Sequence, residues 1–268
     1  MSAGESDDLV ARRHQRILDL ARQAGSVSVE ALALELDVTP QTVRRDLNQL
    51  ARRDLLARVH GGAVVTSGVD NLDHAARRHV AADAKEAIGV AVAALVPNGA
   101  SVLLSIGTTT EAMARALTGH RDLLVVTNNL NIVDILADRP SINVIAVGGE
   151  VRPSDRAVVG ALATEFIRGF KVDLALIGAS AVDHDGTLLD FAVEEVRVAQ
   201  TIIAQSRSVI LGVDHTKFGR PAPIRIAGID AIDHLVTDRL DDDGLRTRCD
   251  AAGVRITEVA AARAAPPV

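Results

Sequence analysis

Five short apolar runs, separated by stretches of helical periodicity, place the strongest constraint on the fold of this chain. Each run is five or six residues long and holds few polar residues, a composition typical of strands that are buried on both faces. Helices between such strands cover the two faces of a parallel sheet. The pattern therefore predicts an α/β domain over residues 83–258, with strands at 101–106, 123–127, 142–147, 172–177 and 208–213 and helices near 83–95, 110–118, 130–138, 161–168 and 193–206.

The first 65 residues follow a different pattern. Apolar residues recur at helical spacing over 8–23, and a second helix is expected over 29–36. Thr39-Pro40 supplies an N-cap and an N1 proline, which open a third helix. The glycine pair Gly61-Gly62 lies between two β-prone runs and predicts a hairpin. The order of these elements predicts a winged helix-turn-helix domain over 1–65, joined by a polar linker at 66–82 that runs into the next helix.

The third helix presents the side chains that a DNA-reading helix needs. Val43, Leu47 and Leu50 fall at i, i+4 and i+7, so they face inward. Polar and basic side chains remain on the outer face, where they can reach base edges and phosphates in a major groove. The alternative is a solvated helix face on a protein-interaction domain. The candidate DNA-binding residues are Thr39, Gln41, Thr42, Arg44, Arg45 and Asn48 on the helix, with Arg58 and His60 on the wing.

Charge is distributed unevenly along the chain. Residues 1–62 hold nine arginines and nine acidic residues, whereas the remainder holds 20 basic and 26 acidic residues. Within 40–60, five arginines stand against two aspartates. A neutral module with one basic face suits local contact with DNA, and an acidic body is repelled from it.

Composition excludes several classes of protein. No apolar run reaches the length of a membrane span, and the acidic start is unlike a secretory signal, so we expect a cytoplasmic protein without a membrane partner. The single cysteine, Cys249, excludes an internal disulfide and a cysteine metal cluster. The chain has neither a Walker A loop nor GxGxxG, and no cofactor or metal is expected.

A candidate phosphate site follows the first predicted strand. Residues 105–111, SIGTTTE, leave the strand and enter a helix with a glycine, three threonine hydroxyls and free amides. Short Gly/Thr turns are common, so an ordinary strand-to-helix turn explains the segment equally well. The carboxyl ends of parallel strands line the ligand crevice of an open α/β sheet. Further polar groups follow strands at Thr127–Asn129, at Gly148–Glu150 with Arg152, and at Asp214–Arg220.

Lysine is rare in this chain. Only Lys85, Lys171 and Lys217 accompany 26 arginines. Because Lys217 lies in the last of the polar strand ends, its ammonium group can act as a point charge for phosphate. The alternative is a surface lysine.

Residues 14–64 resemble the DNA-binding domain of the DeoR family of sugar-metabolism repressors. The runs TVRRDLNQL and RVHGGAV carry this resemblance, and IGTTTEAMARAL, VVTNNLNI, VGGEVRPSDRAVVGALA, DGTLLDF and VDHTKFGR extend it to about residue 240. It is closest to the subgroup of glycerol-3-phosphate regulon repressors. The resemblance implies a sensor domain similar in fold to ribose-5-phosphate isomerase, which binds phosphorylated sugars or polyols.

The resemblance also implies the residues of the effector site. Gly107, Thr108 and Thr109 would cradle the phosphate. At 192–194 this chain has Ala-Val-Glu, where the glycerol-3-phosphate subgroup carries an acidic, an aromatic and a histidine residue. Glycerol 3-phosphate and sugar phosphates therefore stay open as effectors. The residues that would border the pocket are Asn128, Glu195, Asp214 and Lys217.

The expected function is a transcriptional repressor of carbohydrate or polyol catabolism genes, released from double-stranded DNA by a small phosphorylated metabolite. A single winged helix reads few base pairs, so a homo-oligomer, either dimer or tetramer, is expected. One alternative is a phosphosugar isomerase that uses Asp183, Glu195 and Lys217 as acid–base groups, although a DNA reader would then be superfluous. Another is a DNA-binding protein whose second domain serves only oligomerisation; a ligand-induced thermal shift would distinguish it.

Overall fold

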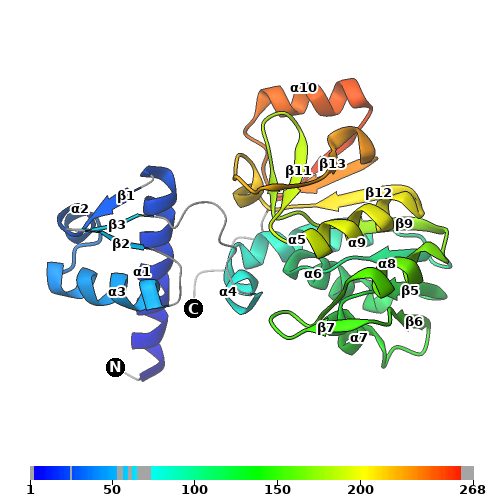
Figure 1. Ribbon diagram of the computed structural model, residues 1–268, viewed down its shortest axis with the longest axis horizontal. Coiled ribbons are helices and arrows are strands. Elements are labelled where there is room, and N and C mark those ends of the chain that lie inside the picture. Colours follow the sequence, from blue (N-terminus) through cyan, green and yellow to red (C-terminus); the bar gives the residue numbers. More distant parts are fainter. Residues whose placement is uncertain (1–2, 25, 53–56, 60–61, 65–73, 261–268) are drawn as a thin grey trace. The chain divides into compact units, whose positions relative to one another are not determined.

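The chain folds into two compact units, Met1–Leu72 and Asp73–Val268. The computed structural model describes residues 3–24, 26–52, 57–59, 62–64 and 74–260 (Figure 1). Within these ranges, no helix has both the length and the apolar composition that crossing a membrane requires.

The first unit has the predicted winged helix-turn-helix pattern. Apolar residues of the three helices, including Ile17, Leu32 and Leu47, form its core. The hairpin is present, and a short strand before the second helix, which the sequence analysis does not predict, pairs with it in a three-stranded antiparallel sheet of order β1-β3-β2. The elements are α1 (Ala3–Ala24), β1 (Ser26–Ser28), α2 (Val29–Glu35), α3 (Pro40–Arg52), β2 (Ala57–Val59) and β3 (Gly62–Val64).

A buried ionic cluster joins α1 to α3. Asp46 of α3 is only 2% exposed. The Arg13 guanidinium donates to its carboxylate through Nε at 2.6 Å and Nη2 at 3.1 Å. The Nε2 atom of His14 lies 3.2 Å from Oδ1 of the same carboxylate. These contacts fix the orientation of α3 on the long first helix.

The second unit is built on a seven-stranded sheet of order β15-β14-β12-β9-β4-β5-β6, and every strand pair in it is parallel. The prediction of a parallel α/β sheet is therefore confirmed. From β4, the next strands β5 and β6 follow on one side, whereas β9 and the later strands follow on the other. The order of strands therefore reverses between β4 and β9, and open sheets bind ligands at such a point. The strands are β4 (Ser101–Leu104), β5 (Leu123–Thr127), β6 (Ile142–Ala146), β9 (Val172–Ile177), β12 (Ser206–Gly212), β14 (His234–Thr237) and β15 (Arg255–Glu258).

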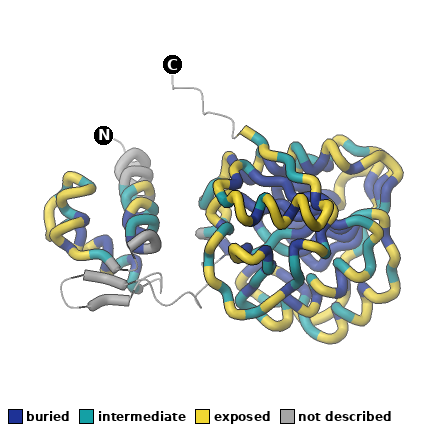
Figure 2. Tube along the Cα trace, turned by 90° about the horizontal axis from the view of Figure 1, so that it is seen from above, coloured by how far each residue is buried: buried dark blue, intermediate teal, exposed yellow. Residues whose placement is uncertain are grey.

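Helices cover both faces of the sheet (Figure 1). Side chains alternate along β4: Val102 and Leu104 face one apolar core, and Leu103 faces the other. Figure 2 shows the buried strands in the middle of this unit and exposed residues on the outer sides of the helices. One core includes residues of α5 (Ala82–Ala93), α6 (Thr108–Ala116) and α7 (Leu130–Leu136), and the other includes residues of α8 (Ala161–Arg168), α9 (Val193–Ala204) and α10 (Asp243–Ala252).

Smaller elements lie around this sheet. A short helix, α4 (His74–His79), falls within the range 66–82 that the sequence predicts as a linker, and it belongs to the second unit. The Asp214 side chain caps a 3-10 turn, η2 (His215–Lys217), directly after β12. Two antiparallel sheets complete the unit: β7 (Glu150–Arg152) with β8 (Ala157–Val159), and β10 (Ala181–Val182) with β11 (Thr187–Asp190) and β13 (Ile224–Gly228).

Candidate functional site

The outer face of α3 carries the predicted DNA-binding side chains. Val43 and Leu47 are fully buried on its inner face. Thr39 caps the helix, because its Oγ1 accepts a hydrogen bond from the backbone N of Thr42 at 3.2 Å and lies 2.9 Å from the Thr42 hydroxyl. Arg58 lies in β2, but its side chain and the whole of His60 fall outside the described part of the chain. Of the predicted residues, Thr39, Gln41, Arg44, Arg45 and Asn48 are exposed, and Thr42 is half-buried.

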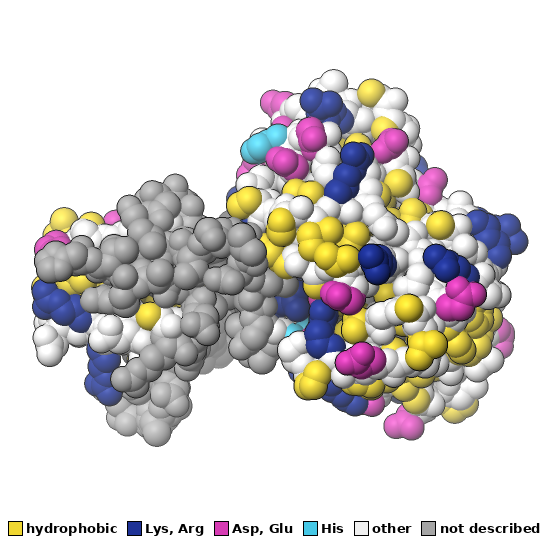
Figure 3. Space-filling view, viewed as in Figure 1, with side chains coloured by type: hydrophobic (Ala, Val, Ile, Leu, Met, Phe, Trp, Pro, Cys, Tyr) yellow, Lys and Arg dark blue, Asp and Glu magenta, His cyan; other side chains and the backbone are white. Residues whose placement is uncertain are grey.

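The charge on this face is concentrated in two arginines. Arg44 and Arg45 are exposed, whereas the acidic residue next to them, Asp46, points inward to Arg13. The positive charge of the arginine pair is therefore available to phosphates. On the second unit, basic, acidic and hydrophobic side chains lie interspersed over the face that Figure 3 shows.

The predicted phosphate segment begins α6 at the carboxyl end of the central strand β4. Gly107 has φ 133°, in the region that favours glycine, and directly precedes the helix. The Thr110 hydroxyl donates to the carbonyl oxygen of Gly107 at 2.8 Å, which closes the turn. Thr108 and Thr109 are 8% and 7% exposed. The first backbone N–H groups of a helix have no acceptor within it, so this end of α6 can bind an anion.

Two more predicted residues carry buried polar atoms that lack a partner among the described residues. Asn128 follows β5; its Nδ2 donates to the carbonyl oxygen of Val158 at 3.0 Å, and its Oδ1 is buried without a hydrogen bond to any described residue. Asp214 follows β12 and is fully buried. Its Oδ1 accepts from the backbone N and the hydroxyl of Thr216, whereas its Oδ2 has no partner within the described part of the chain. Buried polar atoms are usually paired, so these two oxygens are unusual.

Lys217 lies in η2, only 9% exposed. Among the described residues, its ammonium group has no hydrogen bond or ion pair. Burial lowers the pKa of Lys217 to about 8, although the negative charge of Asp214 opposes this shift. A buried cation without a partner suits an anionic ligand.

Glu195 is engaged by an arginine rather than free. The Arg152 Nη2 forms an ion pair with Glu195 Oε1. The same guanidinium donates to Asp155 through Nε at 2.9 Å and Nη2 at 2.5 Å. Burial and the nearby charge of Asp190 raise the pKa of Glu195 to about 7. The structure thus places Glu195 in an ionic cluster with the β7–β8 hairpin.

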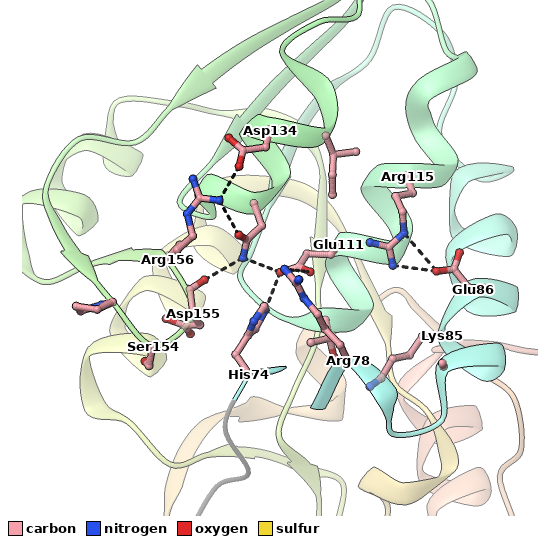
Figure 4. A pocket seen from close by; sticks show the side chains of 15 residues that line it. His74, Arg78, Lys85, Glu86, Glu111, Arg115, Asp134, Ser154, Asp155 and Arg156 are labelled. Carbon is pink, nitrogen blue, oxygen red and sulfur yellow. Dashed lines mark hydrogen bonds and ion pairs between the residues drawn. The ribbon is translucent and has the colours of Figure 1, made fainter. Parts of the chain in front are cut away.

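A pocket of about 650 Å³ opens beside α6 (Figure 4). Of the predicted effector residues, only Thr108 lines it. Glu111 also lines the pocket. It is 1% exposed and accepts hydrogen bonds from His74 Nε2 at 2.7 Å and Asn131 Nδ2 at 3.0 Å. These hydrogen bonds and the positive charges around it hold the pKa of Glu111 below its usual value despite burial.

Lys85 also lines this pocket, and it is not among the predicted effector residues. It is 3% exposed, and its Nζ donates to the carbonyl oxygens of Arg77 and Val80, at 2.6 Å each. Burial lowers the pKa of Lys85, and the negative charges of Asp214 and Glu111 oppose that shift. The only sequence signal of Lys85 is the rarity of lysine.

Comparison with known proteins identifies both units. The DeoR-like helix-turn-helix domain matches residues 13–69, and the DeoR C terminal sensor domain matches residues 80–239. The glycerol-3-phosphate regulon repressor of Haemophilus influenzae is 44% identical over 225 residues, which cover 84% of this chain and 88% of the relative. The repressor of the same name from Escherichia coli is 42% identical over 227 residues, covering 85% and 90%.

Among solved structures, ribose 5 phosphate isomerase A from Neisseria gonorrhoeae matches 50% of this chain and 52% of its own, with a TM-score of 0.37 and 14% identity. The sensor-domain match alone spans more than half of the chain. The two domain matches agree with the two units of the fold. The chain therefore belongs to the DeoR family, with a helix-turn-helix domain followed by a sensor domain.

Proposed function

We propose that this protein is a transcriptional repressor of carbohydrate or polyol catabolism genes, and that a small phosphorylated sugar or polyol releases it from its operator. The exposed polar and basic face of α3 supports the DNA-binding half. The names of the relatives at 42–44% identity support repression. One winged helix contacts few base pairs, so the active species is at least a dimer.

The effector part of this proposal rests on the polar groups after β5 and β12 that have no partner among the residues the structure describes. Asn128 Oδ1 and Asp214 Oδ2 are buried acceptors that need donors, as a hydroxylated ligand provides. Lys217 is a buried cation that needs an anion. The start of α6, at Thr108 and Thr109, supplies further donors for phosphate oxygens. A ligand with hydroxyl groups and a phosphate matches this set.

Binding at one unit changes DNA affinity at the other only if the effector prefers one arrangement of the oligomer. Electrophoretic mobility shift on the DNA upstream of the protein's own gene tests this directly. We expect a specific shift that is released by glycerol 3-phosphate or by one member of a panel of sugar phosphates. A specific shift that no compound changes would contradict the proposed release by an effector, and it would leave the proposed operator binding supported.

We expect Arg44→Ala and Arg45→Ala each to weaken operator binding about tenfold or more, since a lost arginine contact to DNA is worth roughly 1–3 kcal/mol. The matched control is Arg16→Ala. Arg16 is an exposed arginine of the same unit, paired at 2.9 Å with Glu35 away from α3. Titration of labelled operator at fixed salt measures all three. Equal losses in the control and the α3 variants would show a general charge effect and contradict the assignment.

A further inference from the structure

Strand β6 (Ile142–Ala146) forms one edge of the seven-stranded sheet. It pairs with β5 on its inner side, and among the described residues nothing pairs with its outer side. Asn143 and Ala146 are exposed, and Val144 and Ile145 are half-buried. The backbone N–H and C=O groups of an open edge are a template for pairing with another strand. The described part of the chain therefore leaves this edge accessible to a partner.

The composition of β6 does not protect its edge. Folded proteins usually protect an open edge with charged residues, proline or a bulge. The sequence of β6, INVIA, holds no charged residue and no proline, and its register with β5 is regular. At the opposite edge, β15 has the sequence RITE, and its charged residues Arg255 and Glu258 are exposed. Of the two edges, β6 is the one with the composition of a strand that another chain covers.

An apolar strip of α8 lies beside this edge. Ala163 and Ile167 of α8 are buried in the core against which Ile145 of β6 packs. Leu162 and Phe166, one turn apart on α8, are instead 73% and 40% exposed. Figure 3 shows hydrophobic side chains over α8 and β6, at the lower right of the second unit. We call residues 143–146 together with Leu162 and Phe166 the β6–α8 surface.

A twofold axis at the outer edge of β6 makes this surface complementary to itself. An axis perpendicular to the sheet pairs β6 antiparallel with β6 of a second copy, and it keeps both α8 helices on the same side of the joined sheets. The two α8 helices then run antiparallel. Glu165 and Arg168 are exposed on α8 and pair with each other at 2.9 Å. Antiparallel helices would bring each of these charges toward its opposite on the second copy.

We propose that a second copy of this chain covers the β6–α8 surface about a twofold axis, with the two β6 strands paired antiparallel and the two α8 strips packed together. This inference rests on the proposed function, which needs at least two copies to read an operator, and it assigns the surface that holds them. The pairing satisfies the open backbone groups of β6 and removes Leu162 and Phe166 from water.

The test compares the full-length wild type with Leu162→Glu, Ala146→Lys and the control Val90→Glu. Val90 is 64% exposed on α5, which covers the other face of the sheet, so its replacement charges an exposed apolar residue outside the β6–α8 surface. Analytical ultracentrifugation over a concentration series measures the dissociation constant of the dimer. We expect it to rise roughly tenfold or more in Leu162→Glu and in Ala146→Lys, because each buries a charge in the interface, and to stay unchanged in Val90→Glu.

Hydrogen exchange identifies what covers the edge. In the wild type, the backbone amides of residues 142–146 should exchange slowly on both sides of the strand. Leu162→Glu leaves β6 itself unchanged, and it should speed exchange of the outer amides at concentrations where the variant dissociates. Slow exchange of these amides in a wild type that is monomeric would show that another part of the same chain covers β6, and this would overturn the inference.

The remaining outcomes separate this interface from the proposed function. Association as tight as that of the wild type in both β6–α8 variants, or dissociation caused by Val90→Glu alone, would overturn the interface and leave operator and effector binding unaffected. A wild type that dimerises through this surface but binds no operator would support the interface and contradict the proposed function.

Discussion

Replacement of Lys217 by methionine is expected to stabilise the folded protein and to abolish its response to the effector. Burial lowers the pKa of Lys217 from 10.5 to about 8, which means that the charged form is less stable in the folded chain than in the unfolded one. At neutral pH this difference corresponds to about 3 kcal/mol. Methionine fills a similar volume without a charge, so the variant keeps the packing and avoids the unfavourable burial.

The lowered pKa of Lys217 also determines how the stability of the folded protein depends on pH. The unfolded chain keeps the Lys217 proton up to about pH 10.5, and the folded chain releases it near pH 8. Between these values the unfolded state binds more protons, so the stability of the wild type rises with pH. Lys217→Met lacks this rise. Affinity for a phosphorylated effector should have the opposite trend and fall above pH 8, because the neutral amine no longer attracts phosphate.

Lys171→Met is the matched control, because Lys171 is an exposed lysine whose Nζ donates to the carbonyl oxygen of Ala204 at 3.1 Å. Thermal melting at pH 7 and pH 9, with and without effector, measures both effects. We expect the control to keep the wild-type melting temperature and effector shift. A lower melting temperature for Lys217→Met would show that the ammonium group stabilises the fold, and a retained effector shift would remove Lys217 from the site.

The elements that could be predicted are those whose buried residues form a regular pattern of apolar positions in the sequence. The five predicted strands, β4, β5, β6, β9 and β12, read as apolar runs, and β5 (Leu123–Thr127) and β9 (Val172–Ile177) match their predicted bounds. Strand β14 has only four residues, His234–Thr237, too short a run to stand out. Helix α4 has the sequence HAARRH, which forms no apolar stripe. Polar contacts at both of its ends hold it, so hydrophobic periodicity does not predict it.

Some residues of the candidate site could likewise be placed from the sequence, and others could not. Gly107, Asn128 and Asp214 could be placed from sequence because each follows a strand, and a parallel sheet brings the ends of its strands to one edge. The Arg152–Glu195 pair joins residues 43 positions apart, and local sequence patterns give no sign of such a contact.

Asp46 shows that a residue inside a DNA-binding motif can be structural. It lies beside Arg44 and Arg45 in the run TVRRDL, but its carboxylate is buried and bound by Arg13 and His14 of α1. Removing one partner of a buried ion pair costs on the order of 3 kcal/mol. A unit of about 70 residues has a total stability on the order of 5 kcal/mol. We therefore expect Asp46→Ala to remove more than half of the stability of the first unit and to lower its melting temperature by roughly 10–20 °C.

The expected result of Asp46→Ala is weaker operator binding with an intact effector response, because the buried cluster holds α3 whereas the sensor unit has its own apolar cores. Far-UV circular dichroism should show an early melting transition for the first unit, and the effector should still raise the later one. Glu35→Ala is the control: Glu35 also links two helices of this unit, but its pair with Arg16 is half-exposed, so its loss should cost less than about 1 kcal/mol. Suppose that the first unit of Asp46→Ala melts at the same temperature as that of Glu35→Ala and binds operator with the same affinity. The buried cluster then does not hold α3, and the cooperativity of the unit must come from its apolar core alone.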